Sequence, residues 1–146
     1  MDDVSVINRV LVKLFRRINA IEERAICTGK FKNLTINELH VIEAIGAEGS
    51  NNMTAVAKSL DVTTGSLTIS VISLVRKGLA TRVRSEEDRR VVLVKLTELG
   101  KEANARHEEF HSKMIDAIAS ELDSNELEAL TGALYKLNDY FESYDV

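Results

Sequence analysis

Apolar residues at the beginning of the chain recur at alternating steps of three and four positions. The series consists of Val4, Ile7, Leu11, Leu14, Ile18, Ile21 and Ala25. A spacing of about 3.5 residues is typical of a helix that packs a narrow apolar seam against another helix. The pattern therefore predicts a long first helix from about Val4 to Cys27, ending near Gly29.

The middle of the chain contains shorter apolar segments, each preceded by a residue that can cap a helix. Thr35 and Glu38 have the spacing of a capping box, which predicts the start of a second helix. Thr54 predicts the cap of a short third helix. Thr63 predicts the cap of a fourth helix that continues to about Lys77.

Residues 79–84 and 91–96 form two short stretches rich in Val, Leu and Thr. The charged segment 85–90 separates them. Two such stretches around a polar loop predict a two-stranded hairpin. The order helix, turn, helix, hairpin is that of a winged helix-turn-helix, a class of fold that binds DNA.

The last third of the chain predicts two more helices, one that begins at Thr97 and one that begins near Asp123. The second repeats the three-four seam through Leu127, Leu130, Leu134, Leu137, Phe141 and Tyr144. A small monomer has limited core to cover two long apolar seams. We therefore expect the first and last helices to pair in a homodimer, although packing within one subunit would also cover them.

These elements together predict a mainly α protein of the α+β class. We expect a single domain over residues 1–146. Within it, residues 34–96 would form the winged helix-turn-helix lobe, and residues 1–29 and 97–146 would supply the dimerisation helices.

The charge of the chain is distributed unevenly around a net charge of −4. Residues 54–101 carry nine basic and five acidic side chains, whereas residues 102–146 carry three basic and eleven acidic ones. A basic middle region favours an anion-binding lobe carried on helical arms. Uneven surface charge without any partner would give the same counts.

Several classes of function are not expected from this sequence. It contains no nucleophile–base pair, phosphate-binding loop or cofactor motif, which argues against an enzyme. No apolar run approaches the ~20 residues needed to cross a bilayer, so no membrane partner is expected. The single cysteine, Cys27, cannot form an internal disulfide and favours a reducing, cytoplasmic location.

The fourth predicted helix is the first candidate for contact with DNA. Leu67, Val71, Leu74 and Val75 share a face that we expect to point inward. Small and polar residues at its start would let the helix approach a duplex closely. Ile69 would touch thymine methyl groups, or would pack within the subunit. The candidate DNA contacts on this helix are Thr63, Thr64, Gly65, Ser66, Ile69, Ser70 and Ser73.

The predicted hairpin is the second candidate, because arginines occupy its first strand and its tip. These are Arg82, Arg84, Arg89 and Arg90. A narrow minor groove attracts inserted arginine, and Asp88 can hold the Arg90 guanidinium in a fixed fork. The alternative is a solvated charged turn without a partner.

The hairpin carries a resemblance to a known family. The run from Arg82 to Gly100, RVRSEEDRRVVLVKLTELG, resembles the wing of the MarR family of regulators. The segment 74–79 resembles the end of the recognition helix of that family. The resemblance implies a dimeric DNA-binding regulator of palindromic operators, with Asp88 and Arg90 as the wing pair that enters the minor groove.

A second resemblance concerns the effector. The segment 21–23, the motif from Phe31 to His40 and the motif from His107 to Met114 resemble the fatty-acid biosynthesis repressors of this family. That resemblance implies repression of fatty-acid biosynthesis genes. It also implies that a long acyl chain on acyl carrier protein is the effector and that this carrier protein is a partner.

The histidines leave alternatives open. His107 and His111 are spaced by four residues and share one helix face, so they could chelate a metal. The zinc-responsive uptake repressors of the same family are similar here, and that resemblance implies Glu22, His40, His107 and His111 as zinc ligands. These four residues could instead serve an acyl or other small-molecule effector, or hydrogen-bond between helices. Cys27 could be a redox sensor or an inert thiol.

Overall fold

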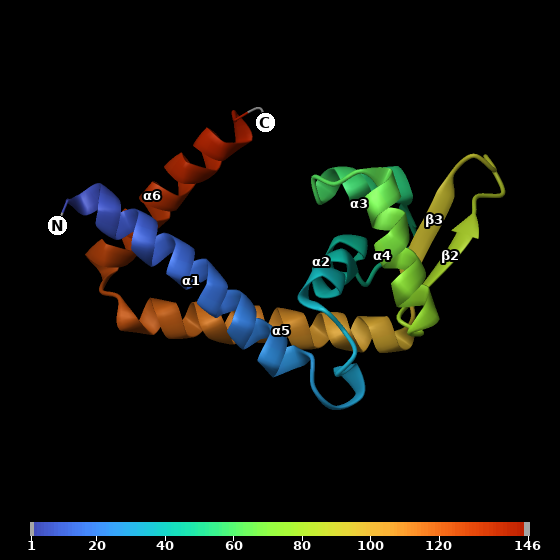
Figure 1. Cartoon of the computed structure of the whole chain (residues 1–146), viewed down its shortest axis with the longest axis horizontal. Coiled ribbons are helices and arrows are strands. Elements are labelled where there is room, and N and C mark those ends of the chain that lie inside the picture. Colours follow the sequence, from blue (N-terminus) through green and yellow to red (C-terminus); the bar gives the residue numbers. More distant parts are fainter. Residues whose placement is uncertain (1, 145–146) are drawn as a thin grey trace. The chain divides into compact units, whose positions relative to one another are not determined.

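Helices make up most of the computed structural model, which describes residues 2–144 (Figure 1). Helix α1 spans Asp3–Ile26 and begins where the carboxylate of Asp2 accepts a hydrogen bond from the Val4 N–H. The first predicted helix is therefore confirmed. The remaining elements are a 3-10 turn at Gly29–Phe31, α2 at Ile36–Ile45, β1 at Asn51–Asn52, α3 at Met53–Ser59, α4 at Thr64–Arg76, β2 at Ala80–Arg84, β3 at Val92–Leu96, α5 at Glu98–Glu121 and α6 at Ser124–Glu142.

The hydrophobic core lies where α2, α3, α4 and the small sheet meet. Its fully buried members include Leu39, Ile42, Ile45, Leu67, Val71, Leu74 and Val94. Three of the four residues expected to point inward from α4 do so, whereas Val75 is 41% exposed. Val75 lies on the edge of the apolar stripe, next to Leu74, and the inward face of α4 is narrower than we predicted.

The sheet has three antiparallel strands in the order β1, β3, β2. The hairpin of β2 and β3 is confirmed, with Ala80 opposite Leu96, and its tip extends beyond α3 and α4 (Figure 1). The short β1 was not predicted, because two asparagines carry no strand signal.

The cap of α3 differs from the prediction, which placed it at Thr54. The side chain of Asn52, not Thr54, accepts the hydrogen bonds that begin the helix, from the backbone N–H groups of Thr54 and Ala55. The neighbouring Asn51 amide donates to the Ile45 carbonyl and so joins the end of α2 to the sheet.

The chain divides into two compact units, one that ends at Phe110 and one that begins at His111. The second unit contains the end of α5 and all of α6, which starts with a complete capping box between Asp123 and Glu126. No residue of α6 is buried. No helix within residues 2–144 combines the length and hydrophobicity needed to span a membrane.

Candidate nucleic-acid interface

The N-terminal end of α4 presents small polar groups. Thr63 caps the helix, and its hydroxyl oxygen accepts a hydrogen bond from the Ser66 N–H at 3.1 Å. Thr63, Thr64, Gly65 and Ser66 are all exposed. Unpaired N–H groups and the positive end of the helix dipole make such a turn a suitable site for phosphate oxygens.

The outward face of α4 carries the apolar side chain that we assigned to base contacts. Ile69 is 73% exposed, whereas Leu67 two positions earlier is buried. An isoleucine with so much exposure is available for thymine methyl groups. Packing of Ile69 within the described part of the subunit is therefore not observed.

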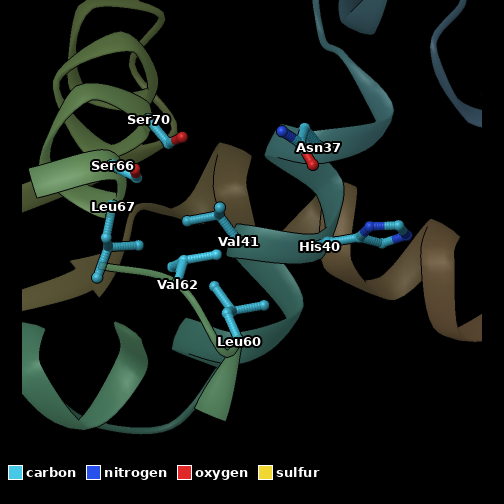
Figure 2. A pocket seen from close by; sticks show the side chains of 8 residues that line it. All are labelled: Asn37, His40, Val41, Leu60, Val62, Ser66, Leu67 and Ser70. Atoms are coloured by element: carbon cyan, nitrogen blue, oxygen red, sulfur yellow. The ribbon is translucent and has the colours of Figure 1, made fainter. Parts of the chain in front are cut away.

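Two of the candidate serines, Ser70 and Ser73, are partly buried rather than exposed. Figure 2 shows Ser66 and Ser70 directed from α4 toward Asn37 on α2, beside a cavity of about 190 Å³. Ser70 is half-buried there, and Ser73 is half-buried one turn later. Contacts of Ser70 and Ser73 with DNA remain predictions, and their present neighbours belong to α2.

The hairpin tip holds its arginine in a defined geometry. The Asp88 carboxylate accepts three hydrogen bonds from Arg90: from the Nε at 3.1 Å, from an Nη at 3.0 Å and from the backbone N–H at 3.1 Å. The side-chain hydrogen bonds from Arg90, followed by its backbone N–H, lower the pKa of Asp88 below its ordinary value. The same contact raises the pKa of Arg90. The structure thus forms the fork that we predicted, with the guanidinium pointing into solvent.

The other arginines of the hairpin differ from one another. Arg84 donates a hydrogen bond from its guanidinium to the Arg89 carbonyl at 2.8 Å, so it braces the loop. Arg82 and Arg89 are exposed. The residue that sequence reasoning missed here is Ser85, whose hydroxyl oxygen accepts from the Asp88 N–H at 3.4 Å.

The base of the hairpin is attached to the ends of α4 and α5. The Thr97 hydroxyl donates to the Gly78 carbonyl at 2.6 Å and accepts from the Gly100 N–H at 3.1 Å. A Cβ on Gly100 would lie 2.0 Å from the Leu79 carbonyl oxygen, so the first turn of α5 needs glycine to approach so closely. This junction ties the base of the hairpin to the end of α4 within the first compact unit.

A partly buried ion pair joins the C-terminal end of α4 to α2. The Lys77 ammonium lies 2.8 Å from each carboxylate oxygen of Glu38. We predicted that Glu38 would close a capping box. The Thr35 hydroxyl does accept from the Glu38 N–H, at 3.1 Å, but the Glu38 side chain turns to Lys77 instead. The two residues are 39 positions apart, and no local pattern indicates their contact.

The candidate effector residues lie in part together. Glu22 and His107, 2% and 1% exposed, contact each other between α1 and α5. The His40 ring lies 6.0 Å from that of His107, centroid to centroid, and His40 also lines the cavity shown in Figure 2. His111 follows His107 by four residues on α5. Glu22, His107 and His111 are residues that could hold a metal.

Cys27 follows the last residue of α1 and is half-buried. Burial, and then the negative charges of Glu23, Glu38 and Glu22, raise the pKa of its thiol. A raised pKa keeps the sulfur protonated at neutral pH, which is the opposite of what a reactive thiolate requires.

Comparison with known proteins supports this geometry. A family model described as transcriptional regulator SarA/Rot matches residues 28–106, more than half of the chain. FabT of Streptococcus pneumoniae, solved in complex with DNA, is 36% identical and has a TM-score of 0.91 over 96% of this chain and 98% of FabT.

Two further transcriptional regulators are similar to this chain, one in sequence and one in fold. The HTH-type transcriptional regulator YpoP of Bacillus subtilis is 32% identical over 89 residues, which are 58% of this chain and 63% of YpoP. A MarR-family transcription regulator that is 18% identical shares the fold, with a TM-score of 0.82 over 97% of this chain and 91% of its own. The winged-helix fold and the resemblance to MarR-type regulators are thereby confirmed. The matched proteins are regulators and not enzymes.

Proposed function

The chain belongs to the SarA/Rot family of transcriptional regulators, and on this premise we propose that it binds palindromic operator DNA as a homodimer. DNA binding follows from the family. We propose in addition the palindromic site, the dimer and the contacting residues. FabT, which is 36% identical, was solved with DNA, and this supports the same mode of binding here.

One observation supports the proposed mode, in which α4 and the hairpin contact neighbouring grooves of DNA. Within one lobe, the exposed first turn of α4 and the exposed Arg90 of the wing both present hydrogen-bond donors to the surroundings. In this mode α4 enters the major groove, where Gly65 permits close approach and Ile69 touches thymine methyl groups. Arg90, held by Asp88, enters the neighbouring minor groove.

The exposed apolar seams of α1 and α6 support the homodimer. Val4, Ile7, Leu14 and Phe15 on α1 are exposed, as are Leu127, Leu130, Leu134, Leu137 and Phe141 on α6. Contiguous apolar faces of this kind mark protein–protein contacts. A twofold dimer would present two α4 helices to half-sites about 34 Å apart, one turn of DNA.

Selection of duplexes from a random-sequence library tests the DNA-binding mode. We expect enrichment of a palindrome, with an affinity at least about 10³-fold above that for an unrelated duplex at the same salt concentration. Failure to enrich any sequence, or equal affinity for both duplexes, would contradict the proposal.

We further propose that the chain represses fatty-acid biosynthesis genes and responds to an acyl chain carried by acyl carrier protein. The identity to FabT over nearly the whole chain supports this. An acyl effector would shift the dimer toward the conformation whose two recognition helices match the operator. The cytoplasmic location expected from the single cysteine stays a prediction.

The effector is tested with the selected operator. Operator affinity is titrated with a long-chain acyl carrier protein and, as a matched control, with the same carrier protein without its acyl group. We expect only the acylated form to change the affinity. No change with either form rejects the acyl effector and leaves the DNA-binding result intact.

A zinc-responsive repressor is the second candidate, because Glu22 and His107 are buried together. Carboxylate and imidazole are suitable zinc ligands, so the residues fit the metal. Glu22, His107 and His111 would hold it, with His40 as a further ligand, and the zinc would supply a fixed link between α1 and α5. Two zinc ions per dimer in protein purified without chelator, lost on His111→Ala, would support this candidate against the acyl effector.

A further inference from the structure

The C-terminal end of α4 is attached to α2 by a fully satisfied ammonium group. Lys77 Nζ donates to both carboxylate oxygens of Glu38 at 2.8 Å and to the Asn33 carbonyl at 2.5 Å. A lysine has three N–H donors, so these three oxygens use all of them. The Ser73 hydroxyl lies 3.5 Å from the same carboxylate.

Burial fixes the geometry of this pair more firmly than that of an ordinary surface ion pair. The Glu38 side chain is 10% exposed and that of Lys77 is 28% exposed. By contrast, the pair between Lys101 and Glu98 is separated by 3.4 Å, with the glutamate 93% exposed. A carboxylate removed from water needs its partner, so the Glu38–Lys77 pair holds one geometry instead of exchanging with solvent.

The helix itself does not depend on this pair. At its C-terminal end the Gly78 N–H donates to the Val75 carbonyl at 3.0 Å, and the Leu79 N–H donates to the Leu74 carbonyl at 2.9 Å. These backbone bonds end α4 in the manner of a Schellman motif. The side-chain pair therefore acts on the placement of α4 against α2 and not on the formation of α4.

The other end of α4 is held differently. Beneath its first two turns lies the cavity of about 190 Å³, whose lining includes Val62, Ser66 and Ser70 but no aspartate, glutamate, lysine or arginine. A helix of 13 residues is about 20 Å long, so a rotation of about 5° at the Lys77 end would displace the first turn by nearly 2 Å. The first turn is the part that faces DNA in the proposed mode.

We propose that Glu38 and Lys77 are positioning residues for the recognition helix, and that their ion pair sets how well the protein discriminates its operator from other DNA. The proposal rests on the proposed function, because it requires α4 to contact bases. Lys77 acts through Glu38 and touches no phosphate. Loss of the pair lets α4 tilt, which weakens base contacts but leaves the wing and its charge in place.

The experiment compares Glu38→Gln and Lys77→Met with the wild-type protein on the operator and on an unrelated duplex of equal length, at several salt concentrations. Lys32→Met is the matched control for Lys77→Met, because it removes one exposed positive charge from the same compact unit. We expect both test variants to lose about tenfold or more in operator affinity, the size of one lost base contact, with unrelated DNA bound as before. The control should retain the ratio of the two affinities.

Two outcomes would overturn the proposal. If the melting temperature falls while the ratio of operator to unrelated affinity stays constant, the pair only stabilises the lobe. If Lys77→Met reduces the salt dependence of binding by about one counterion, Lys77 contacts a phosphate directly. Failure of the wild-type protein to select any duplex would instead reject the proposed function, so the two failures are distinguishable.

A conservative variant keeps the test valid if Glu38→Gln or Lys77→Met does not fold. Lys77→Arg retains the charge and can donate two hydrogen bonds to the Glu38 carboxylate. We expect this variant to retain most of the operator preference. Discrimination as poor as that of Lys77→Met in a folded Lys77→Arg protein would contradict a role for the ion pair.

Discussion

Helices α4 and α6 carry the same kind of apolar stripe and differ in what covers it. In α4, Leu67, Val71 and Leu74 are at most 1% exposed, because α2, α3 and the sheet pack against them. In α6 the corresponding residues are 38% to 62% exposed, namely Leu127, Leu130, Leu134, Leu137 and Phe141.

This difference separates two meanings of amphipathic periodicity. A period near 3.6 residues shows that one face of a helix will be covered, but not which chain covers it. The stripe of α4 is completed within the subunit and builds the lobe that presents the wing. The stripe of α6 is left for a second copy in the proposed dimer, so its energy would appear in association and not in the folding of one chain.

A charge in the stripe of α6 should give the largest effect on DNA binding. We expect Leu134→Asp to separate the dimer and to lower operator affinity by about 10²–10⁴-fold, because each half-site would then be bound independently. Sedimentation and a fluorescence titration measure the two effects. Lys136→Gln changes the net charge by the same amount on the opposite side of α6 and should remain dimeric. A dimeric Leu134→Asp protein would show that this stripe is not the interface.

The wing arginine should give a smaller effect that leaves the dimer intact. We expect Arg90→Ala to weaken operator binding by about 10- to 100-fold and to lower the salt dependence by about one counterion, because one groove contact is lost. The charged fork with Asp88 exists above the ordinary pKa of Asp88 and is lost as the pH falls through its lowered value in the folded state. Asp88 therefore stays ionised between about pH 6 and 8, and its protonation should not change operator affinity in this range. Unchanged operator affinity of Arg90→Ala would remove the minor-groove role.

Substitution of two glycines, one closely packed and one without close neighbours, tests how firmly each region is packed through the free energy of unfolding. Gly100→Ala would place a Cβ 2.0 Å from the Leu79 carbonyl oxygen, and we expect a loss of about 1–3 kcal/mol in the free energy of unfolding. A Cβ at Gly132 on α6 would meet no neighbouring group within 4 Å, and Gly132→Ala should add about 0.5–1 kcal/mol through helix propensity. Urea denaturation at fixed protein concentration measures both. If Gly100→Ala left the free energy of unfolding unchanged, the backbone at the junction between β2 and α5 would shift at little cost.

Cys27 should give the smallest effect. Its raised pKa predicts slow reaction with an alkylating reagent at pH 7, increasing as the pH approaches and passes the ordinary thiol value. Cys27→Ser should bind the operator as the wild-type protein does, before and after mild peroxide treatment. Peroxide sensitivity that disappears in Cys27→Ser would instead identify a redox sensor.

Most of the fold was predictable because its determinants are local. Thr35, Thr63 and Asp123 cap helices as their positions predict, and the hairpin follows from two β-prone stretches around a charged loop. The fork between Asp88 and Arg90 was predictable for the same reason, since the residues are two positions apart. The Glu38 side chain was predicted wrongly because its partner, Lys77, lies 39 positions away. The other two errors were local: Asn52 caps α3 through residues two and three positions on, and Val75 lies at the edge of the apolar stripe of α4.

By itself, the sequence determined the helices, the wing and the family, because periodicity, caps and turn residues act within a few positions along the chain. The tertiary structure decided which groups meet across the fold. It paired Glu38 with Lys77, brought Glu22 to His107 and turned Ser70 toward α2. Such contacts depend on the packing of whole elements, and a buried charge or hydroxyl takes the partner that the packing brings within reach.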